Sequence, residues 1–378
     1  MPELYIGLMS GTSLDGMDGA LVDLADSDAG RIRVLSHAHS PFEAAFASEL
    51  LALNSPGSNE LHRSELAANA LARIGAQIVS RLLESSCRKN SEVRAIGSHG
   101  QTVRHCPGEF DGTGYTVQLN SAALLAEATS IDVVADFRSR DVAAGGQGAP
   151  LVPAFHRAVF GSNHATVGVL NLGGMSNLTV LCGNGDTNGF DCGPGNALLD
   201  MWCRRHLDQA FDAEGHWSAG GQVDLELLAR LQAEPFFHAD PPKSTGRDRF
   251  NAAWLDSRLV QHDGEPAIDP RNVQATLVEL TAWACARDLQ RHAPDALQLL
   301  VCGGGASNAH LMHRLAGRLP GLTISASDAA GLPANQVESV AFAWLARACI
   351  LRQAGNLPAV TGAGGPRILG AIYPGGFD

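Results

Sequence analysis

The chain has 378 residues, of which 45 % are hydrophobic and 17 % are charged, and its formal net charge at pH 7 is −12. This length favours two domains over one, the composition is that of a globular protein, and the acidic balance argues against a nucleic-acid-binding surface. No apolar run approaches the roughly 20 residues that a membrane helix needs, and the start, Met1-Pro2-Glu3, lacks the basic residues of a signal peptide.

Strands and helices alternate along the first part of the chain. Short apolar runs between turn residues predict strands, and apolar residues that share one face of a 3.6-residue period predict helices. The predicted strands are Leu4–Met9, Gly19–Leu24, Ile32–His37, Val93–Ser98, Tyr115–Leu119 and Asp132–Phe137, and the predicted helices are Ser64–Glu84 and Ser121–Ala128. A glycine-rich stretch, Ala143–Pro150, then interrupts the pattern.

After this interruption the opening pattern of strand, glycine-rich turn and strand recurs. The predicted strands of the second part are Thr166–Leu172, Asn177–Cys182, Gln298–Val301 and Thr323–Ala326, and the predicted helices are Asn196–His206, Asp224–Ala233, Asn272–His292, Ala309–Leu319 and Gln336–Gln353. Two halves that each open with such a hairpin suggest an internal duplication, although short apolar strands with glycine turns also recur by chance.

Three glycine-rich turns are candidates for binding phosphate or nucleoside. Ser10–Asp18 and Leu172–Ser176 each join two strands, and Cys302–Asn308 leads from a strand into a helix. Backbone N–H groups in such turns can hold phosphate oxygens, and a helix N-terminus attracts anions. None matches a Walker A or G-x-G-x-x-G motif. Taken alone, Ser10–Asp18 and Cys302–Asn308 are equally well tight connections, and for Leu172–Ser176 a plain turn is the favoured interpretation. Together they form the layout of an ATP site between two similar domains.

The cysteines and histidines predict neither a disulfide framework nor a metal site. The eight cysteines are scattered without a C-x-x-C pair, and the close histidine pairs, His37/His39 and His310/His313, have no third ligand nearby in sequence. Reduced thiols are typical of cytosolic proteins. We therefore expect a cytoplasmic protein with neither a nucleic-acid nor a membrane partner.

A set of motifs in family order resembles the anhydro-N-acetylmuramic acid kinase family, within the actin, hexokinase and Hsp70 superfamily. The motifs are Met9–Asp18, Gly97–Thr102, Ala135–Asp141, Gly145–Phe155, Asn171–Asn177, Gly189–Asn196, Pro242–Arg247 and Val301–Asn308. The resemblance implies an α/β fold of two RNase H-like domains flanking an ATP cleft. We place these domains at residues 1–140 and 141–378, with the last helix near the cleft.

The reaction that this resemblance implies needs a general base. The family opens the 1,6-anhydro ring of its sugar with water and transfers the γ-phosphoryl group of ATP to O6, giving N-acetylmuramic acid 6-phosphate in peptidoglycan recycling. One carboxylate beside the sugar would activate the water. Asp191, in Phe190-Asp-Cys-Gly-Pro-Gly, matches the residue that the family uses as the base. An Asp beside Gly-Pro is otherwise more often a turn or helix-cap residue.

ATP and Mg²⁺ are the implied cosubstrate and metal. The expected nucleotide contacts are Gly11, Thr12, Ser13, Leu14, Asp15, Gly16, Met17 and Asp18 in the first turn, Gly173 and Gly174 in the second, and Gly304 and Gly305 in the third. Asp15 and Glu338 are the candidate Mg²⁺ ligands, since carboxylates bind this ion. Glu338 at a helix start is equally well an acid that answers the helix dipole.

The implied sugar carries a lactyl carboxylate and several polar groups. Arg138 and Arg140 are candidates to bind the carboxylate, and His99 and Gln101 are candidates to bond the polar groups. Arginines at such positions more often make structural ion pairs. The resemblance also implies a homodimer.

Two other functions remain open from the sequence. One is a kinase or phosphatase of the same fold that acts on another small substrate, and the other is an ATP-driven binding protein of the Hsp70 or actin kind. The chain lacks the long extra domain of a chaperone, which favours the enzyme.

Overall fold

The computed structural model describes residues 2–11, 13–27, 30–247, 249–260 and 268–376. The chain divides into two compact units, one made of residues 1–160 and 336–378 and the other of residues 161–335. This differs from the predicted division at residue 140, because residues 141–160 and the last long helix both belong to the first unit. Two separate main sheets, one in each unit, agree with the two α/β domains expected from the sequence.

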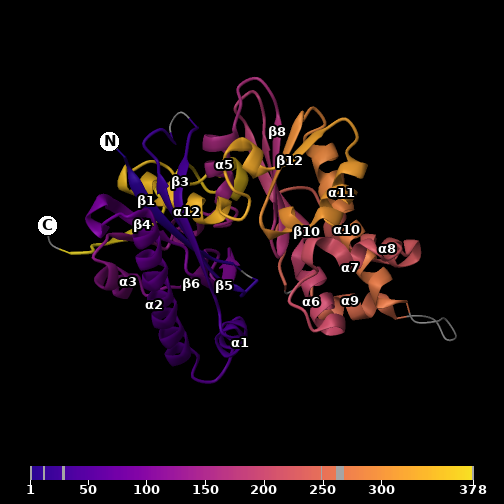
Figure 1. Cartoon of the computed structure of the whole chain (residues 1–378), viewed down its shortest axis with the longest axis horizontal. Helices are drawn as coiled ribbons and strands as arrows, with labels where there is room; N and C mark the ends of the chain where they lie inside the picture. The colour runs from indigo at the N-terminus through magenta and orange to yellow at the C-terminus, as the bar shows by residue number, and fades with distance from the viewer. Residues whose placement is uncertain (1, 12, 28–29, 248, 261–267, 377–378) are drawn as a thin grey trace. The chain divides into compact units, whose positions relative to one another are not determined.

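The first unit contains a six-stranded mixed sheet with the order β13-β7-β4-β1-β2-β3 (Figure 1). Its strands are β1 (Leu4–Ser10), β2 (Gly16–Asp23), β3 (Arg33–Pro41), β4 (Val93–Ser98), β7 (Val133–Ala135) and β13 (Ala371–Tyr373), and a separate hairpin pairs β5 (Gln101–Pro107) with β6 (Gly114–Leu119). Its helices are α1 (Ala44–Ala52), α2 (Glu60–Ser86), α3 (Ala122–Thr129), α4 (Ser139–Ala143), α5 (Val152–Phe160), α12 (Val337–Ile350) and α13 (Pro358–Thr361).

Helices α2 and α12 cover opposite faces of this sheet. A Cβ on Gly7 of β1 would lie 1.8 Å from the Ser339 carbonyl oxygen of α12, and a Cβ on Gly97 of β4 would lie 2.0 Å from the Phe342 carbonyl oxygen. On the other face, a Cβ on Gly19 would lie 2.3 Å from Ile78 of α2. Since neighbouring residues of a strand point to opposite faces, the missing side chains let both helices approach closely. This packing explains why α12 belongs to the first unit.

The second unit contains a five-stranded sheet with the order β10-β9-β8-β11-β12 (Figure 1). Its strands are β8 (Val167–Leu172), β9 (Met175–Leu181), β10 (Thr187–Pro194), β11 (Gln298–Cys302) and β12 (Thr323–Ala326). Its helices are α6 (Asn196–Leu207), α7 (His216–Ala219), α8 (Leu225–Gln232), α9 (Ala252–Leu259), α10 (Pro270–His292) and α11 (Ala309–Arg318). Helix α10 is buried along most of its length and contributes much of this unit's apolar core.

The two sheets share one topology. In each sheet, the first strand pairs antiparallel with the second, and the second pairs antiparallel with the third. The fourth strand pairs parallel with the free edge of the first, and the fifth strand pairs parallel with the fourth. The matching strands are β1 with β8, β2 with β9, β3 with β10, β4 with β11 and β7 with β12. This common order supports the internal duplication that the two hairpins suggested, and it is the order expected of RNase H-like domains.

Short 3₁₀ segments also occur in the part of the chain that the structure describes, among them Asn90–Glu92, Ala213–Gly215, Pro235–His238, Gly304–Ser307 and Ser327–Ala330. Within the described residues no helix is both long and apolar enough to cross a membrane.

Candidate functional site

The first glycine-rich turn joins β1 to β2, as predicted. The Leu14 backbone has φ 58°, and the Leu14 N–H donates to the Gly11 carbonyl at 3.3 Å, which closes the turn. Asp15 is exposed, and Ser13 Oγ donates to Asp15 Oδ1 at 2.5 Å. Thr12, which the sequence placed among the nucleotide contacts, lies outside the described residues.

Three other residues of this turn make contacts within the protein. A Cβ on Gly16 would lie 2.5 Å from the His39 ring and from the Ser40 carbonyl, so β3 packs directly against it. Met17 is buried in the core of the first unit. Asp18 Oδ1 lies 3.1 Å from His37 Nε2 and from His39 Nδ1. The structure therefore gives Gly16, Met17 and Asp18 packing and polar partners on neighbouring elements.

His99 and Arg138 are brought together in the first unit. His99 is buried, and its ring packs on Phe342 of α12 with ring centroids 4.6 Å apart. Nε2 of His99 accepts from Arg138 Nε at 3.1 Å and lies 2.9 Å from Arg138 Nη2. Because a protonated imidazole could not accept these bonds, His99 is neutral with its proton on Nδ1. Burial and the Arg138 charge hold the pKa of His99 well below its usual value.

Arg138 is anchored on the side facing His99 and Gly148. Its Nη1 donates to the Gly148 carbonyl at 2.8 Å, which leaves one further N–H on each terminal nitrogen. Burial lowers the pKa of the guanidinium to about 10, while Glu338 and Asp141 oppose this shift. Glu338, in the first turn of α12, is thus an electrostatic neighbour of Arg138.

The other two predicted sugar contacts differ in exposure. Gln101 at the start of β5 is 1 % exposed, and its Oε1 has no hydrogen-bond partner among the described residues. Arg140 is exposed on α4. The next residue, Asp141, is fully buried and accepts from the Gly148 N–H, Asn356 Nδ2 and Thr361 Oγ1. This carboxylate ties the glycine-rich segment after α4 to the C-terminal part of the chain.

The second and third glycine-rich turns lie side by side in the second unit. Parallel pairing of β8 with β11 sets Asn171 opposite Cys302, so both strands deliver their following turns to one edge of the sheet. A Cβ on Gly305 would lie 2.6 Å from Leu172, and a Cβ on Gly303 would lie 2.4 Å from Asn171 Oδ1. Gly303 also has φ 81°, a conformation that favours glycine.

The second turn also caps helix α6. The Gly173 carbonyl accepts from Asn196 N–H at 2.8 Å, and the Gly174 carbonyl accepts from the Gly195 and Ala197 N–H groups at 3.0 Å. Asn196 Nδ2 donates to the Leu172 carbonyl at 3.0 Å. These bonds hold the hairpin turn against the start of the helix.

Some of these glycines leave open space where a ligand could approach, and others do not. A Cβ on Gly11 or Gly173 would come no closer than 3.5 Å to another atom in its surroundings, and a Cβ on Gly304 no closer than 3.9 Å. Gly16, Gly303 and Gly305, in contrast, contact the protein itself. We therefore separate glycines that face open space from glycines required by internal packing.

Asp191 lies on β10 beside an irregularity in the pairing of β10 with β9. Its backbone N–H donates to the Lys243 carbonyl at 3.1 Å, and its Oδ2 accepts from the Thr245 N–H at 2.9 Å. Burial raises the pKa of Asp191 to about 6, and the Thr245 N–H and the Lys243 charge partly oppose this effect. A carboxylate with a pKa in this range is ionised at pH 7 yet basic enough to take a proton.

The sequence did not single out Lys243 and Thr245, which contact Asp191, or Asp288, which pairs with Lys243. The Lys243 and Thr245 positions fall within the motif Pro242–Arg247 noted above. Asp288 is an acidic residue among the buried residues of α10, and Lys243 Nζ donates to its Oδ2 at 2.8 Å. An acidic residue at a helix position that otherwise carries buried side chains could have indicated this pair from the sequence.

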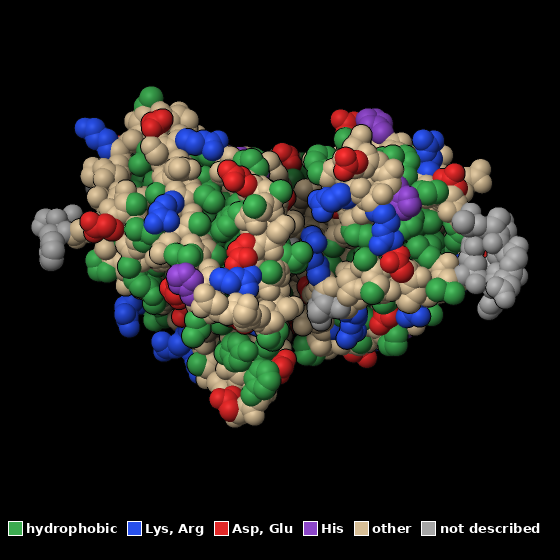
Figure 2. All heavy atoms as spheres, turned by 90° about the horizontal axis from the view of Figure 1, so that it is seen from below, with side chains coloured by type: hydrophobic (Ala, Val, Ile, Leu, Met, Phe, Trp, Pro, Cys, Tyr) green, Lys and Arg blue, Asp and Glu red, His purple; other side chains and the backbone are tan. Residues whose placement is uncertain are grey.

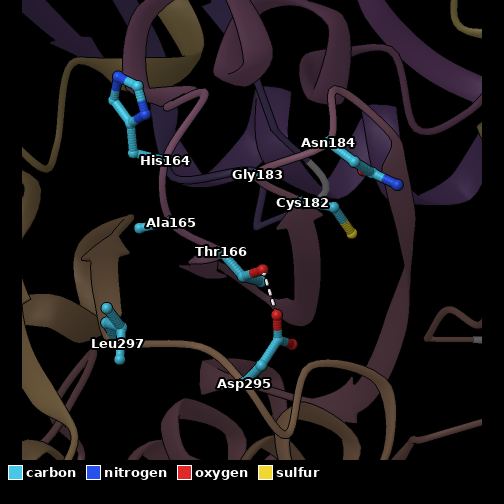
Figure 3. Close-up of a pocket in the computed structure, with 8 residues that line it drawn as sticks. All are labelled: His164, Ala165, Thr166, Cys182, Gly183, Asn184, Asp295 and Leu297. Carbon is cyan, nitrogen blue, oxygen red and sulfur yellow. Dashed lines mark hydrogen bonds between the residues drawn. The ribbon is translucent and has the colours of Figure 1, made fainter.

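An open groove in the second unit lies beside the start of β8 and the end of β9, the end of this strand pair away from the glycine-rich turn. Figure 3 shows its lining residues. Thr166 Oγ1 donates to Asp295 Oδ2 at 2.6 Å within it. Its lining residues are His164, Ala165, Thr166, Cys182, Gly183, Asn184, Asp295 and Leu297. None of them is a predicted site residue, so this groove is separate from the glycine-rich turns.

The charged side chains give no single-sign surface on the face drawn in Figure 2. Lys and Arg side chains alternate there with Asp and Glu side chains and with hydrophobic ones. Across the described residues, no three His, Cys, Asp or Glu side chains gather in an arrangement that could hold a metal ion.

Comparison with known proteins identifies the family. The family described as anhydro-N-acetylmuramic acid kinase matches residues 3–375. A protein of that name from Variovorax paradoxus is 60 % identical over 379 residues, covering 98 % of this chain and 99 % of the relative. Another from Albidiferax ferrireducens is 57 % identical over 394 residues, covering 99 % and 100 %. Among solved structures, component A of (R)-2-hydroxyglutaryl-CoA dehydratase from Acidaminococcus fermentans has a TM-score of 0.48 and 13 % identity, covering 90 % and 96 %. On the full-length sequence matches, the chain belongs to the anhydro-N-acetylmuramic acid kinase family.

Proposed function

We propose that this member of a sugar-kinase family opens the 1,6-anhydro ring of anhydro-N-acetylmuramic acid with water and phosphorylates O6 with ATP. The product would be N-acetylmuramic acid 6-phosphate, formed in the recycling of cell-wall sugars. The observation that carries this proposal is the family match over nearly the whole chain.

Asp191 is the base in this proposal. Its carboxylate takes a proton from water as the water oxygen bonds to C1, the C1–O6 bond breaks, and O6 bonds to the γ-phosphorus as ADP leaves. Partial burial and a pKa near 6 suit this role, because the carboxylate is ionised at neutral pH but only weakly solvated. The Thr245 N–H, bonded to Oδ2, leaves Oδ1 to face the water.

The glycine-rich turns are the proposed nucleotide site. Gly11, Gly173 and Gly304 have the open space that close approach of phosphate or nucleoside requires. Transfer of a phosphoryl group depends chiefly on alignment and on neutralising its charge. Mg²⁺ supplies that neutralisation when bound. Asp15 and Glu338 are the carboxylates proposed to hold it, together with water and phosphate oxygens, the ligands that Mg²⁺ usually keeps.

Arg138 is the residue proposed to bind the lactyl carboxylate of the sugar. Its two remaining N–H groups offer a fork for a carboxylate. His99 has its Nε2 engaged by Arg138, so its proposed part is to hold the guanidinium. Gln101 and Arg140 remain proposed sugar contacts. We further propose that the protein acts in the cytoplasm as a homodimer, which sedimentation at several concentrations would test.

Product analysis tests the proposed reaction directly. The purified protein is incubated with the anhydro sugar, ATP and Mg²⁺ in ¹⁸O-labelled water, and the product is analysed by mass spectrometry and NMR. We expect one ¹⁸O atom at C1 and phosphate on O6 in the same molecule. A phosphorylated sugar with an intact anhydro ring, or an opened sugar without phosphate, would contradict the proposal.

A further inference from the structure

The segment around Lys243 holds Asp191 at two points. The Lys243 carbonyl accepts the Asp191 N–H at 3.1 Å, and the Thr245 N–H donates to Asp191 Oδ2 at 2.9 Å. One bond fixes the backbone of β10, and the other fixes the orientation of the carboxylate. Any displacement of this segment would therefore move Asp191.

A buried ion pair anchors that segment to α10. Lys243 Nζ donates to Asp288 Oδ2 at 2.8 Å, and the two side chains are 4 % and 2 % exposed. The Lys243 ammonium also lies 5.0 Å from the Phe236 ring centroid and 5.7 Å from that of Phe190. Phe190 directly precedes Asp191, so the ammonium is close to the strand that carries the carboxylate.

Stability alone is a weak reason for such a pair. The cost of removing two charges from water often equals or exceeds their mutual attraction, and apolar side chains of similar volume frequently serve as well. A buried ammonium beside a partly buried carboxylate has a second effect, since it favours the ionised form of that carboxylate.

We propose that Lys243 and Asp288 form a positioning pair that orients the Asp191 carboxylate, with the Lys243 charge keeping this carboxylate ionised for water activation. The inference rests on the proposed function, in which Asp191 is the base. Lys243 and Asp288 act through Asp191 and are not themselves assigned a contact with the substrate.

Several other charged or titratable groups lie near this pair. The charged and titratable neighbours are Arg249 on the segment, Arg287, Arg291, His292 and Cys285 on α10, Cys192 on β10, and Asp240, which pairs with Arg291. Burial lowers the pKa of His292, and Cys285 together with burial raises the pKa of Cys192, so both are uncharged at neutral pH. Lys243 is the charge that lowers the pKa of Asp191 against the effect of burial.

Opposite substitutions in the pair should move the Asp191 titration in opposite directions. Lys243→Met removes the charge that favours the ionised carboxylate. The acidic limb of the plot of kcat/KM against pH should therefore move to higher pH, by about one unit. Asp288→Asn leaves the Lys243 charge uncompensated, so the acidic limb should move to lower pH. A pair that served only to hold the fold would lower activity without shifting the limb in opposite directions.

A second readout follows Asp191 without turnover. The Thr245 amide resonance, observed after threonine-selective ¹⁵N labelling, should titrate with Asp191 and shift in the same two directions. Suppose that the Asp191→Asn variant stayed active, while the Thr245 resonance titrated as expected in the wild type and in the Lys243 and Asp288 variants. The base assignment would then fail, and the action of the pair on Asp191 would stand. The matched control is Arg314→Met. It removes one of the two arginines that pair with Glu279, a buried carboxylate on α10, the helix that also carries Asp288. It should leave both titrations unchanged.

The result that overturns the inference is the absence of opposite shifts in folded variants. If Lys243→Met fails to fold, Lys243→Met combined with Asp288→Met replaces the pair with apolar side chains. This double variant should still titrate at higher pH than the wild type, because Lys243 is the charge that lowers the pKa of Asp191. A wild-type titration in the double variant would equally refute the proposal.

Discussion

The Thr245 backbone N–H donates to Oδ2 of Asp191 at 2.9 Å, across 54 residues of sequence. A turn or helix-cap aspartate would instead accept from the N–H groups two or three residues after it. The observed partner belongs to a distant segment, so the carboxylate is held by tertiary structure. Asp191 is therefore held differently from a turn or helix-cap aspartate, and its substitution can test the proposed role as a base.

Replacing Asp191 with Asn should abolish most of the activity and retain nucleotide binding. The side chains are nearly the same size, but the amide cannot take the proton of water, and loss of a general base typically costs about 10²–10⁴ in rate. Steady-state kinetics with the anhydro sugar and calorimetric titration with an ATP analogue would measure both effects. A folded variant that turns over the sugar at close to the wild-type rate would end the assignment.

The same variant should change the pH dependence of stability. The pKa of Asp191 is about 6 in the folded protein against an ordinary value of 3.8, so the native state binds more protons than the unfolded state between these values. Stability contributed by this group is present at low pH and is lost as the pH rises through this window. As the pH rises from 4 to 7, the free energy of unfolding of Asp191→Asn should therefore increase relative to that of the wild type, by on the order of 2 kcal/mol. Urea unfolding at several pH values would measure this, and a difference that did not vary with pH would count against the raised pKa.

Glycine substitutions should separate nucleotide contacts from packing positions. Gly304→Val adds a side chain in open space, where the nearest atom is Asn196 Nδ2 at 3.9 Å, and should weaken ATP binding with little change in Tm. Gly16→Val would instead collide with His39 and Ser40 and should lower Tm. Titration with ATP and thermal unfolding of both variants would show this contrast. Unchanged ATP affinity in Gly304→Val would remove the third turn from the nucleotide site.

Asp141 should be required for stability. It is fully buried, and Asp141→Ala would leave the Gly148 N–H without an acceptor. The same change would remove the shorter hydrogen bonds of Asn356 Nδ2 and Thr361 Oγ1, which would keep only the longer ones to the Gly365 and Leu357 carbonyls at 3.4 and 3.5 Å. A buried polar group left unpaired costs about 1–3 kcal/mol, so the loss should be at least about 1 kcal/mol. Arg140→Ala, at the neighbouring exposed position, should change stability by less than about 0.5 kcal/mol. Denaturant unfolding of both variants tests this, and equal stabilities would contradict the assigned role.

Domain closure should accompany turnover. The two units each have their own sheet and are joined by two chain crossings, near residues 160 and 335, an arrangement that permits hinge motion. Closure would keep bulk water from hydrolysing ATP. Small-angle scattering should show a more compact protein with both the nucleotide and the sugar than with neither. The same radius of gyration in every ligand state would argue against closure.

Local sequence patterns determined most of the elements of this protein and the positions of its glycine-rich turns. Strands β4 and β12 begin and end where the apolar runs predicted, because alternation between turn residues and short apolar segments is a local property. Strand β10, which carries Asp191, was not predicted, because its two glycines and terminal proline weaken the strand pattern. The family motifs also placed Asp191 and the three turns, each within a few consecutive residues.

Tertiary structure alone decided which distant residues meet. The return of α12 to the first unit depends on Gly7 and Gly97, whose missing side chains match the backbone of a helix more than 240 residues later. Lys243 meets Asp288, and His99 meets Arg138, through packing that no periodicity records. Hydrophobic patterns report how a segment lies relative to the core, but a hydrogen bond between segments depends on the position of both. Sequence therefore identified the carboxylate, whereas only the folded chain supplied the groups that hold it and set its pKa.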